Sequence, residues 1–165
     1  MPRPRVLLIV DTDRPPVASI IDDVRKLLRD HAEVVAELDT DMHPLDGGVR
    51  ADLAVVLGGD GTLLAQGRRL VDAAIPLVGV NVGRLAFLAE FDWDSLQQQA
   101  DAVFGGRAPI RERMILAASV QDESGTTIET TMAINDCVVT AGPPFRMIEL
   151  QLRVDGAEEI GRAHV

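Results

Sequence analysis

The sequence predicts an α/β domain with a parallel sheet, followed by the opening strands of an antiparallel β domain. Two short, unbroken apolar runs, at residues 6–10 and 53–57, are typical of strands covered on both faces. A stripe of apolar residues at helical spacing follows each run, and this alternation builds parallel sheets. From residue 111 onward, apolar and polar residues alternate instead, which favours strands with one buried face.

The first strand, the first helix and the second strand are expected within residues 6–38. Pro15 and Pro16 suit the first turn of a helix, because proline lacks the N–H that a helix start leaves unpaired. Residues 33–38 are expected as a strand, and residues 39–50, rich in Asp, Gly and Pro, as a loop. The apolar stripe of this helix is Val17, Ile20, Ile21, Val24, Leu27 and Leu28.

The same alternation continues to a predicted domain boundary, so that the α/β domain spans residues 1–106. A glycine-rich turn at 58–62, with the sequence GGDGT, joins the third strand to the second helix. The elements expected here are a strand at 53–57, a helical stripe at 63–74, a strand at 77–80 and a helix at 93–104.

Residues 107–159 are predicted to form an incomplete β domain. Strands are expected at 114–120 and 126–140, on either side of a turn at 122–125. Alternation is complete in 148–154, and the Asp155–Gly156 pair that follows is a turn signal. So short a β segment is expected to need further strands to complete its sheet.

Composition narrows the classes of partner. With 165 residues, 47% hydrophobic and 25% charged, the chain can bury a core. Sixteen Lys and Arg against 26 Asp and Glu give a net charge of −10, which argues against nucleic acid or an anionic membrane as partner. A single cysteine, Cys137, excludes an internal disulfide, and no run approaches the roughly 20 apolar residues of a membrane span. We therefore expect a cytoplasmic protein with no metal held by its own residues.

The turn at 58–62 is the strongest candidate for a functional site. Three glycines in four positions, at the carboxyl end of a parallel strand, are expected to present backbone N–H groups to an anion. Asp60 is unusual there, because a carboxylate repels phosphate unless it takes a proton from an attacking hydroxyl or helps to hold Mg²⁺. The pattern indicates phosphoryl transfer from a nucleotide to an alcohol. The alternative is that Asp60 or Thr62 merely caps the helix.

Three ordered segments resemble motifs of the NAD kinases. Residues 58–62 are similar to their GGDGT motif, which diacylglycerol, sphingosine and 6-phosphofructo kinases share more loosely. Residues 79–88, GVNVGRLAFL, resemble the segment G-[IV]-N-x-G-x-L-G-F-L, and residues 133–139, AINDCVV, resemble A-L-N-[ED]-[VI]-x-[VI]. The resemblance implies an N-terminal α/β domain, a C-terminal β domain, and phosphorylation of the adenosine-ribose 2′-hydroxyl of NAD by ATP or polyphosphate.

The resemblance also implies roles for single residues. Asp60 would accept the proton of the 2′-hydroxyl, and Phe87 would lie against the adenine. Asn135 and Asp136 would hydrogen-bond the dinucleotide, and Asn81 would order the loop that carries Phe87, together with Gly83. The residues of the phosphate-contacting turn would be Gly58, Gly59, Gly61 and Thr62. Mg²⁺ or another divalent cation would accompany ATP, and the full-length protein would be a homo-oligomer.

Two departures from the family pattern lead to further expectations. Ala86 stands where the family has glycine, which would strain the loop if its φ were positive. In the family, a D-G segment and a T-P-T-G-S-T-A-Y segment normally follow just past the position at which this sequence stops, and neither is here. Residues 160–165 match one reading frame of a common sequencing-adapter end, so we expect the natural sequence to continue differently. A chain cut there is expected to be poorly soluble or inactive.

Other functions remain open on the sequence alone. A lipid or sugar kinase could share GGDGT, and a noncatalytic module could bind the dinucleotide without turnover. Asp11 and Asp13 resemble the acidic cluster of a receiver domain, but no lysine stands at a matching later strand end.

Overall fold

A computed structural model describes residues 2–41, 43, 45, 49–83, 86–144, 148 and 150–159. By its internal contacts the chain divides into two units, Met1–Asn135 and Asp136–Val165, and each is described by itself. The change from α/β to β pattern near residue 106 lies inside the first unit, whose last helix is followed only by strands. Residues 160–165 lie outside the described residues.

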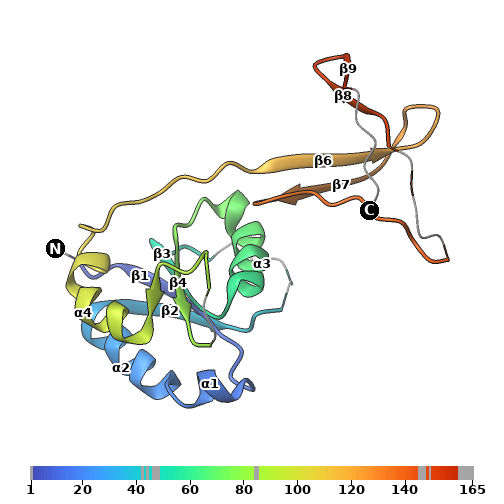
Figure 1. The fold of residues 1–165 in the computed structure, drawn as a ribbon. Coiled ribbons are helices and arrows are strands. Elements are labelled where there is room, and N and C mark those ends of the chain that lie inside the picture. The colour runs from blue at the N-terminus through green and yellow to red at the C-terminus, as the bar shows by residue number, and fades with distance from the viewer. Residues whose placement is uncertain are drawn as a thin grey trace. The chain divides into compact units, whose positions relative to one another are not determined.

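The first unit is built on a five-stranded sheet in which every strand pair is parallel. The strand order is β2-β1-β3-β4-β5, so β1 and β3 are neighbours at the centre (Figure 1). This confirms the predicted parallel α/β architecture. The strands are β1 Arg5–Ile9, β2 Glu33–Leu38, β3 Leu53–Leu57, β4 Leu77–Asn81 and β5 Phe91–Asp92.

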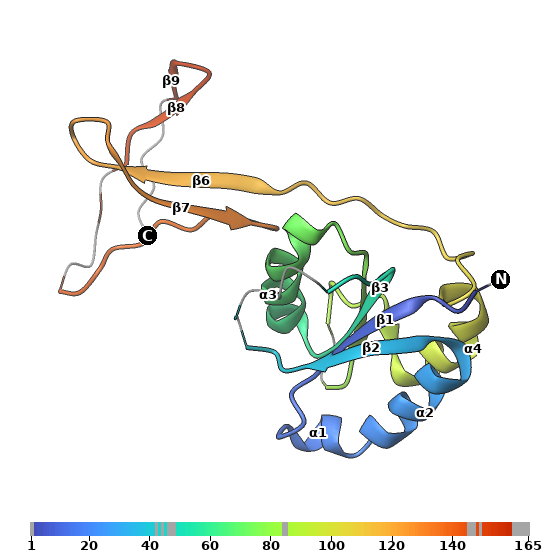
Figure 2. The same cartoon turned by 180° about the vertical axis from the view of Figure 1, so that it is seen from behind.

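Helices cover both faces of this sheet, as Figures 1 and 2 show from opposite sides. On one face α1 (Pro15–Ala18), α2 (Ile21–His31) and α4 (Trp93–Val103) pack on side chains such as Leu8 and Val55. On the other face α3 (Asp60–Leu70) packs on Leu7, Ile9, Ala54 and Val56. Successive residues of β1 and β3 therefore point to opposite, fully covered faces, which explains their unbroken apolar sequences.

The helix expected from Pro15 onward is interrupted after one turn. Ser19 Oγ donates to the Pro16 carbonyl (2.8 Å), and Ile20 leaves helical geometry, with φ −123° and ψ −8°. The apolar stripe is nevertheless buried across the break, because Val17, Val24 and Leu28 are all fully covered. Periodicity predicted the buried face correctly, but it gave no sign of the break between α1 and α2.

Helix α4 is held by a complete capping box at its start. The Asp92 carboxylate accepts from Ser95 N (2.8 Å) and Ser95 Oγ (2.6 Å), while Asp92 N donates to Ser95 Oγ (2.9 Å). These bonds, the Ser95 hydroxyl first, hold the pKa of the Asp92 carboxyl below its ordinary value.

Asp92→Ala is therefore expected to destabilise the chain in a pH-dependent way. The pKa of Asp92 is lowered in the folded state. Its contribution to the free energy of unfolding is therefore present above the ordinary aspartate pKa and is lost as the pH falls through the lowered pKa. Urea unfolding at neutral pH should show a lower free energy of unfolding for the variant, and the difference should vanish in acid. Asp94→Ala, which removes a charge from the same first turn but no capping bond, should show a smaller effect. Equal losses for both variants would contradict this account of the cap.

The strands after α4 form two small antiparallel hairpins, which confirms the change to antiparallel β structure. In the first unit β6 (Leu116–Gln121) pairs with β7 (Thr127–Ala133), and β7 is shorter than the stretch expected at 126–140. In the second unit β8 (Leu152–Val154) pairs with β9 (Ala157–Glu159) across the predicted Asp-Gly turn. Both residues of that turn have positive φ, 50° and 82°.

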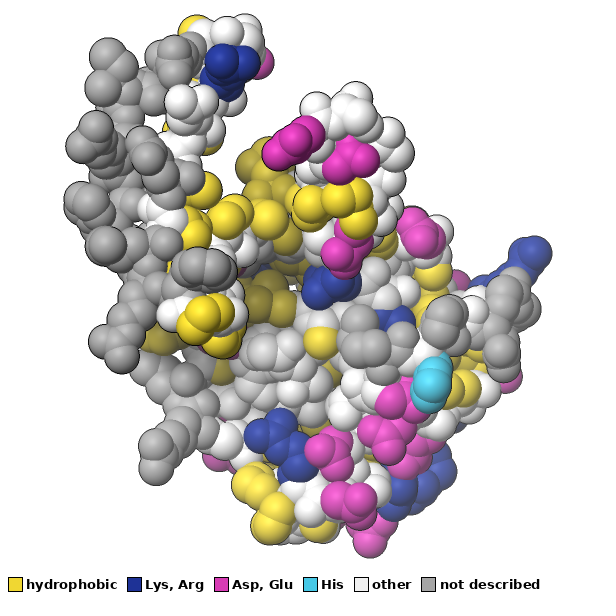
Figure 3. Space-filling model, turned by 90° about the vertical axis from the view of Figure 1, so that its right-hand side faces the viewer, with side chains coloured by type: hydrophobic (Ala, Val, Ile, Leu, Met, Phe, Trp, Pro, Cys, Tyr) yellow, Lys and Arg dark blue, Asp and Glu magenta, His cyan; other side chains and the backbone are white. Residues whose placement is uncertain are grey.

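Large apolar side chains of the β6–β7 hairpin are exposed in the described part of the chain, whereas Met132 is half-buried. Val120 is 56% exposed and Ile128 67% exposed. Figure 3 shows hydrophobic side chains at the surface among acidic ones. Two strands alone make too small a sheet to bury a face, so alternation in the sequence is not enough for burial.

Candidate functional site

The glycine turn at the end of β3 depends on the absence of Cβ atoms at its glycines. Gly58 is buried, its N–H donates to the Val80 carbonyl (3.0 Å), and a Cβ added there would lie 2.6 Å from Thr62 Cβ. Gly59 and Gly61 have no atom within 4 Å of such a Cβ, so their backbone is open to close approach. None of the three has a positive φ. The glycines thus provide space for Thr62 and for a ligand rather than a left-handed turn.

Asp60 is the first residue of α3, but its carboxylate is directed to another loop. Its Oδ1 accepts from Phe87 N (3.1 Å) and Leu88 N (2.9 Å), and its Oδ2 accepts from Phe87 N (3.0 Å). The helix has no side-chain capping bond at Gly59, its N-cap residue. The Asp60 carboxylate therefore bonds the backbone at 87–88 rather than the start of its own helix. Oδ2 shares one N–H only, which leaves it lone pairs for a further hydrogen bond.

Phe87 combines a fixed backbone with a free side chain. Its N–H is held by Asp60, whereas its ring is 86% exposed. An exposed aromatic ring beside a carboxylate offers a flat surface for a planar heterocycle. The bond between Asp60 and Phe87 joins residues 27 positions apart, so no local sequence signal could have indicated it.

The backbone just after β4 is bonded to the last residue of the strand. Asn81 Oδ1 accepts from Gly83 N (3.2 Å). At the start of this segment, Gly79 lies so close to α3 that a Cβ there would be 2.7 Å from Leu63 Cδ1. Close packing of α3 on β4 thus brings Asp60 within reach of the following loop.

A cavity of about 210 Å³ adjoins the glycine turn, and we call it the switch-point cavity. It lies where β1, β3 and β4 end. The connection after β1 leads to the helices on one face of the sheet, whereas the connection after β3 leads to α3 on the opposite face. This is the position at which open α/β sheets bind ligands. The lining residues are Arg14, Pro16, Val17, Gly59, Asn81, Val82 and Gly83.

Asn135 and Asp136 follow β7 and are both exposed. Asn135 ends the first unit and Asp136 begins the second. The preceding residue, Ile134, packs on α3, since a Cβ at Gly67 would lie 2.5 Å from Ile134 Cδ1. The structure therefore brings Asp60 into contact with Phe87 and places Asn81 beside Gly59 of the glycine turn. The roles given to Asn135 and Asp136 stay predictions.

The described residues do not fit a metal centre of their own. They contain no group of three or more His, Cys, Asp or Glu side chains placed to hold an ion. Asp60 is already bonded to two backbone N–H groups. A divalent cation would therefore have to be held mainly by the phosphates of a nucleotide, as Mg²⁺ often is.

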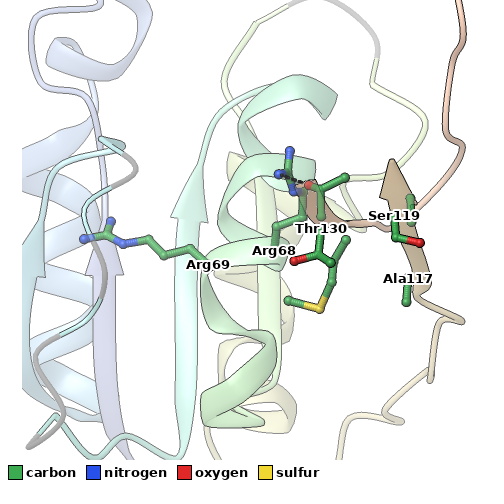
Figure 4. Close-up of a pocket in the computed structure, with 8 residues that line it drawn as sticks. Arg68, Arg69, Ala117, Ser119 and Thr130 are labelled. Carbon is green, nitrogen blue, oxygen red and sulfur yellow. Dashed lines mark hydrogen bonds between the residues drawn. The ribbon is translucent and has the colours of Figure 1, made fainter. Parts of the chain in front are cut away.

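A second hollow, of about 640 Å³, lies between α3 and the β6–β7 hairpin (Figure 4). Arg68 reaches across it and donates to Thr131 Oγ1 (3.1 Å), whereas Arg69 points the other way and donates to the Asp39 carbonyl (2.9 Å). Gln66 is fully buried beside Arg69 and donates to the Thr40 carbonyl (2.8 Å). None of these contacts was predicted from the sequence, although a glutamine inside a helical apolar stripe is a signal of a buried polar group.

Comparisons with known proteins agree with this fold. Residues 39–108 match the family model of the ATP-NAD kinase N-terminal domain. Proteins named NAD kinase from Azoarcus sp. and Nitrosospira multiformis are 46% and 41% identical to the chain, over 109 and 124 residues. These matches cover 66% and 73% of this chain but 37% and 42% of the relatives. The chain therefore spans less than half the length of the curated relatives that it matches.

Solved structures show the same architecture. A yeast NADH kinase complexed with NADH superposes with a TM-score of 0.76 at 19% identity, over 96% of this chain and 52% of that one. An NAD kinase from Archaeoglobus fulgidus in complex with ATP gives a TM-score of 0.66 at 24% identity, over 94% and 56%. No described helix of this chain has the length and apolar character needed to cross a bilayer.

The family model, the curated relatives and the shared fold confirm the resemblance carried by the three motifs. The chain belongs to the NAD kinase family, of which it carries the N-terminal part.

Proposed function

We propose that this chain is part of an enzyme that transfers a phosphoryl group from ATP or polyphosphate to the adenosine-ribose 2′-hydroxyl of NAD. The observation that carries the proposal is the Asp60 carboxylate, held by the Phe87 and Leu88 N–H groups beside an open glycine turn. Relatives named NAD kinase, and a related fold solved with ATP, support the same substrates.

Asp60 acts as the general base of this reaction. Its free lone pair on Oδ2 accepts the proton of the 2′-hydroxyl as the ribose oxygen attacks the terminal phosphorus. The new O–P bond forms while the bond from that phosphorus to the bridging oxygen breaks, and the shortened phosphate chain leaves with the electron pair. The two backbone N–H groups keep the carboxylate in one orientation, so that little reorganisation is needed during proton transfer.

Other residues bind the substrates. The exposed Phe87 ring covers the adenine of NAD, and the open backbone of Gly59 and Gly61 admits phosphate oxygens. Asn135 and Asp136 hydrogen-bond ribose hydroxyls, since an amide and a carboxylate together offer donors and acceptors. A divalent cation bound to ATP neutralises phosphate charge. The full-length protein works as a cytoplasmic homo-oligomer.

The test is an acceptor screen with the full-length protein that contains this segment. With ATP or polyphosphate as donor, ³¹P NMR should show a phosphomonoester on the 2′-oxygen of NAD and none on sugars or diacylglycerol. Phosphorylation of a sugar or lipid in place of NAD would show a different kinase sharing GGDGT. Dinucleotide binding without turnover would show a sensing module. The 165-residue chain alone is expected to give no turnover, because large apolar side chains of its antiparallel strands, such as Val120, Ile128 and Leu152, are exposed.

A further inference from the structure

Arg14 lines the switch-point cavity, and the proposed function gives it no role. We infer that this cavity binds the phosphate chain of the phosphoryl donor and that Arg14 is its ligand. The inference rests on the proposed function and adds the residue that holds the donor. It concerns a chemistry common to ATP and inorganic polyphosphate, a linear run of phosphate groups.

Charge favours an anion in this cavity. Arg14 is the only charged side chain among the described residues that line it, although the whole chain carries a net charge of −10. Its guanidinium makes no hydrogen bond or ion pair with any described residue. Elsewhere arginines are used in ion pairs, as at Arg5 with Asp52 and Arg25 with Glu37. Arg14 is thus free to present its planar fork to phosphate oxygens, a geometry that arginine matches with two parallel bonds.

The size and walls of the cavity select the phosphate chain rather than a whole nucleotide. Pockets that enclose drug-sized ligands measure roughly 300–1,000 Å³, whereas this cavity measures about 210 Å³. Two of its walls, at Gly59 and Gly83, have no atom within 4 Å of a possible Cβ, so phosphate oxygens can approach the backbone there. The nucleoside part of ATP would then lie outside.

The position of the cavity suits the reaction. Gly59 lines the cavity and is bonded directly to Asp60, whose carboxylate is the proposed base. Arg14 approaches from the segment that follows β1, and Asn81 and Gly83 from the segment that follows β4. A donor phosphate in the cavity is therefore placed beside the residue that would deprotonate the acceptor.

The test is calorimetric titration of the 165-residue chain and its Arg14→Gln variant with tripolyphosphate, ATP and adenosine. Arg14→Gln should weaken both tripolyphosphate and ATP binding about 10-fold or more, because charged hydrogen bonds to phosphate are lost. Arg29→Gln is the matched control, since Arg29 is an exposed arginine on α2 outside the cavity. The inference would be overturned if Arg14→Gln left the binding of both anions unchanged, or if Arg29→Gln weakened binding equally. It would also be overturned if the parent chain bound neither anion.

Steady-state kinetics of the full-length protein provide a second, independent readout. Arg14→Gln should raise KM for the donor about 10-fold and leave KM for NAD within about 2-fold. If NAD is phosphorylated but KM for the donor does not depend on Arg14, the inference fails and the proposed function stands. If tripolyphosphate binds through Arg14 but NAD is never phosphorylated, the proposed function fails instead. The two donors are distinguished by whether KM depends on Arg14 with ATP alone or with polyphosphate as well.

Discussion

Asp60→Asn in the full-length protein should lower the rate of NAD phosphorylation at least about 10²-fold. An amide cannot take the proton of the 2′-hydroxyl, so the step that activates the nucleophile is lost. The fold should survive, because an Asn oxygen can still accept from the Phe87 and Leu88 N–H groups that hold Asp60. Binding of NAD should therefore change little, and kcat should carry the loss.

The measurement is initial-rate kinetics with NAD varied, together with the affinity for NAD from titration. Asp72→Asn is the control, because Asp72 is an exposed acid in the short 3₁₀ turn η1 (Val71–Ala73) that follows α3. It removes the same charge and should leave kcat unchanged. An Asp60→Asn variant with nearly full activity would show that the carboxylate serves only to hold the loop at Phe87.

Gly58→Ala should destabilise the first unit by about 1–3 kcal/mol, the usual cost of overpacking. The new Cβ would lie 2.6 Å from Thr62 Cβ, an atom fixed by its own backbone, so α3 must shift away from the end of β3. Gly58 is buried and its N–H is bonded to β4, which prevents the strand from moving instead. Phosphoryl transfer should fall as well, because the shift displaces Asp60.

Gly61→Ala separates this steric effect from the general effect of adding a methyl group. Gly61 is exposed in the first turn of α3 with free space around its Cβ position, so the variant should be more stable by about 0.4–1 kcal/mol. Urea unfolding of both variants of the 165-residue chain measures the difference. Equal stability of Gly58→Ala and the parent chain would contradict the close contact with Thr62.

Hydrophobic pattern predicted the layered sheet because burial on two faces leaves a clear trace in the sequence. The runs of β1 and β3 are buried as expected, and their residues divide between two cores. Elements without such a trace were missed. The two-residue strand β5 (Phe91–Asp92) is too short for periodicity, and the division between α1 and α2 lies at Ile20, inside one continuous apolar stripe.

The sequence contains the residues of the candidate site but gives no sign of the contacts between them. The glycine turn and Asp60 stand together in the sequence, and their chemistry follows from residue type. The bonds from Phe87 and Leu88 to Asp60 join two loops through tertiary structure, and a single sequence carries no record of such pairing. The open surroundings of Gly59 and the cavity beside Arg14 are equally properties of the assembled sheet.

A crystal structure of the full-length protein with NAD bound tests the role of Asp60 most directly. We expect a carboxylate oxygen of Asp60 within about 2.6–3.2 Å of the adenosine-ribose 2′-oxygen, or joined to it through one water molecule. A dinucleotide bound with that hydroxyl well beyond reach of Asp60, and beside a different basic group, would contradict the account.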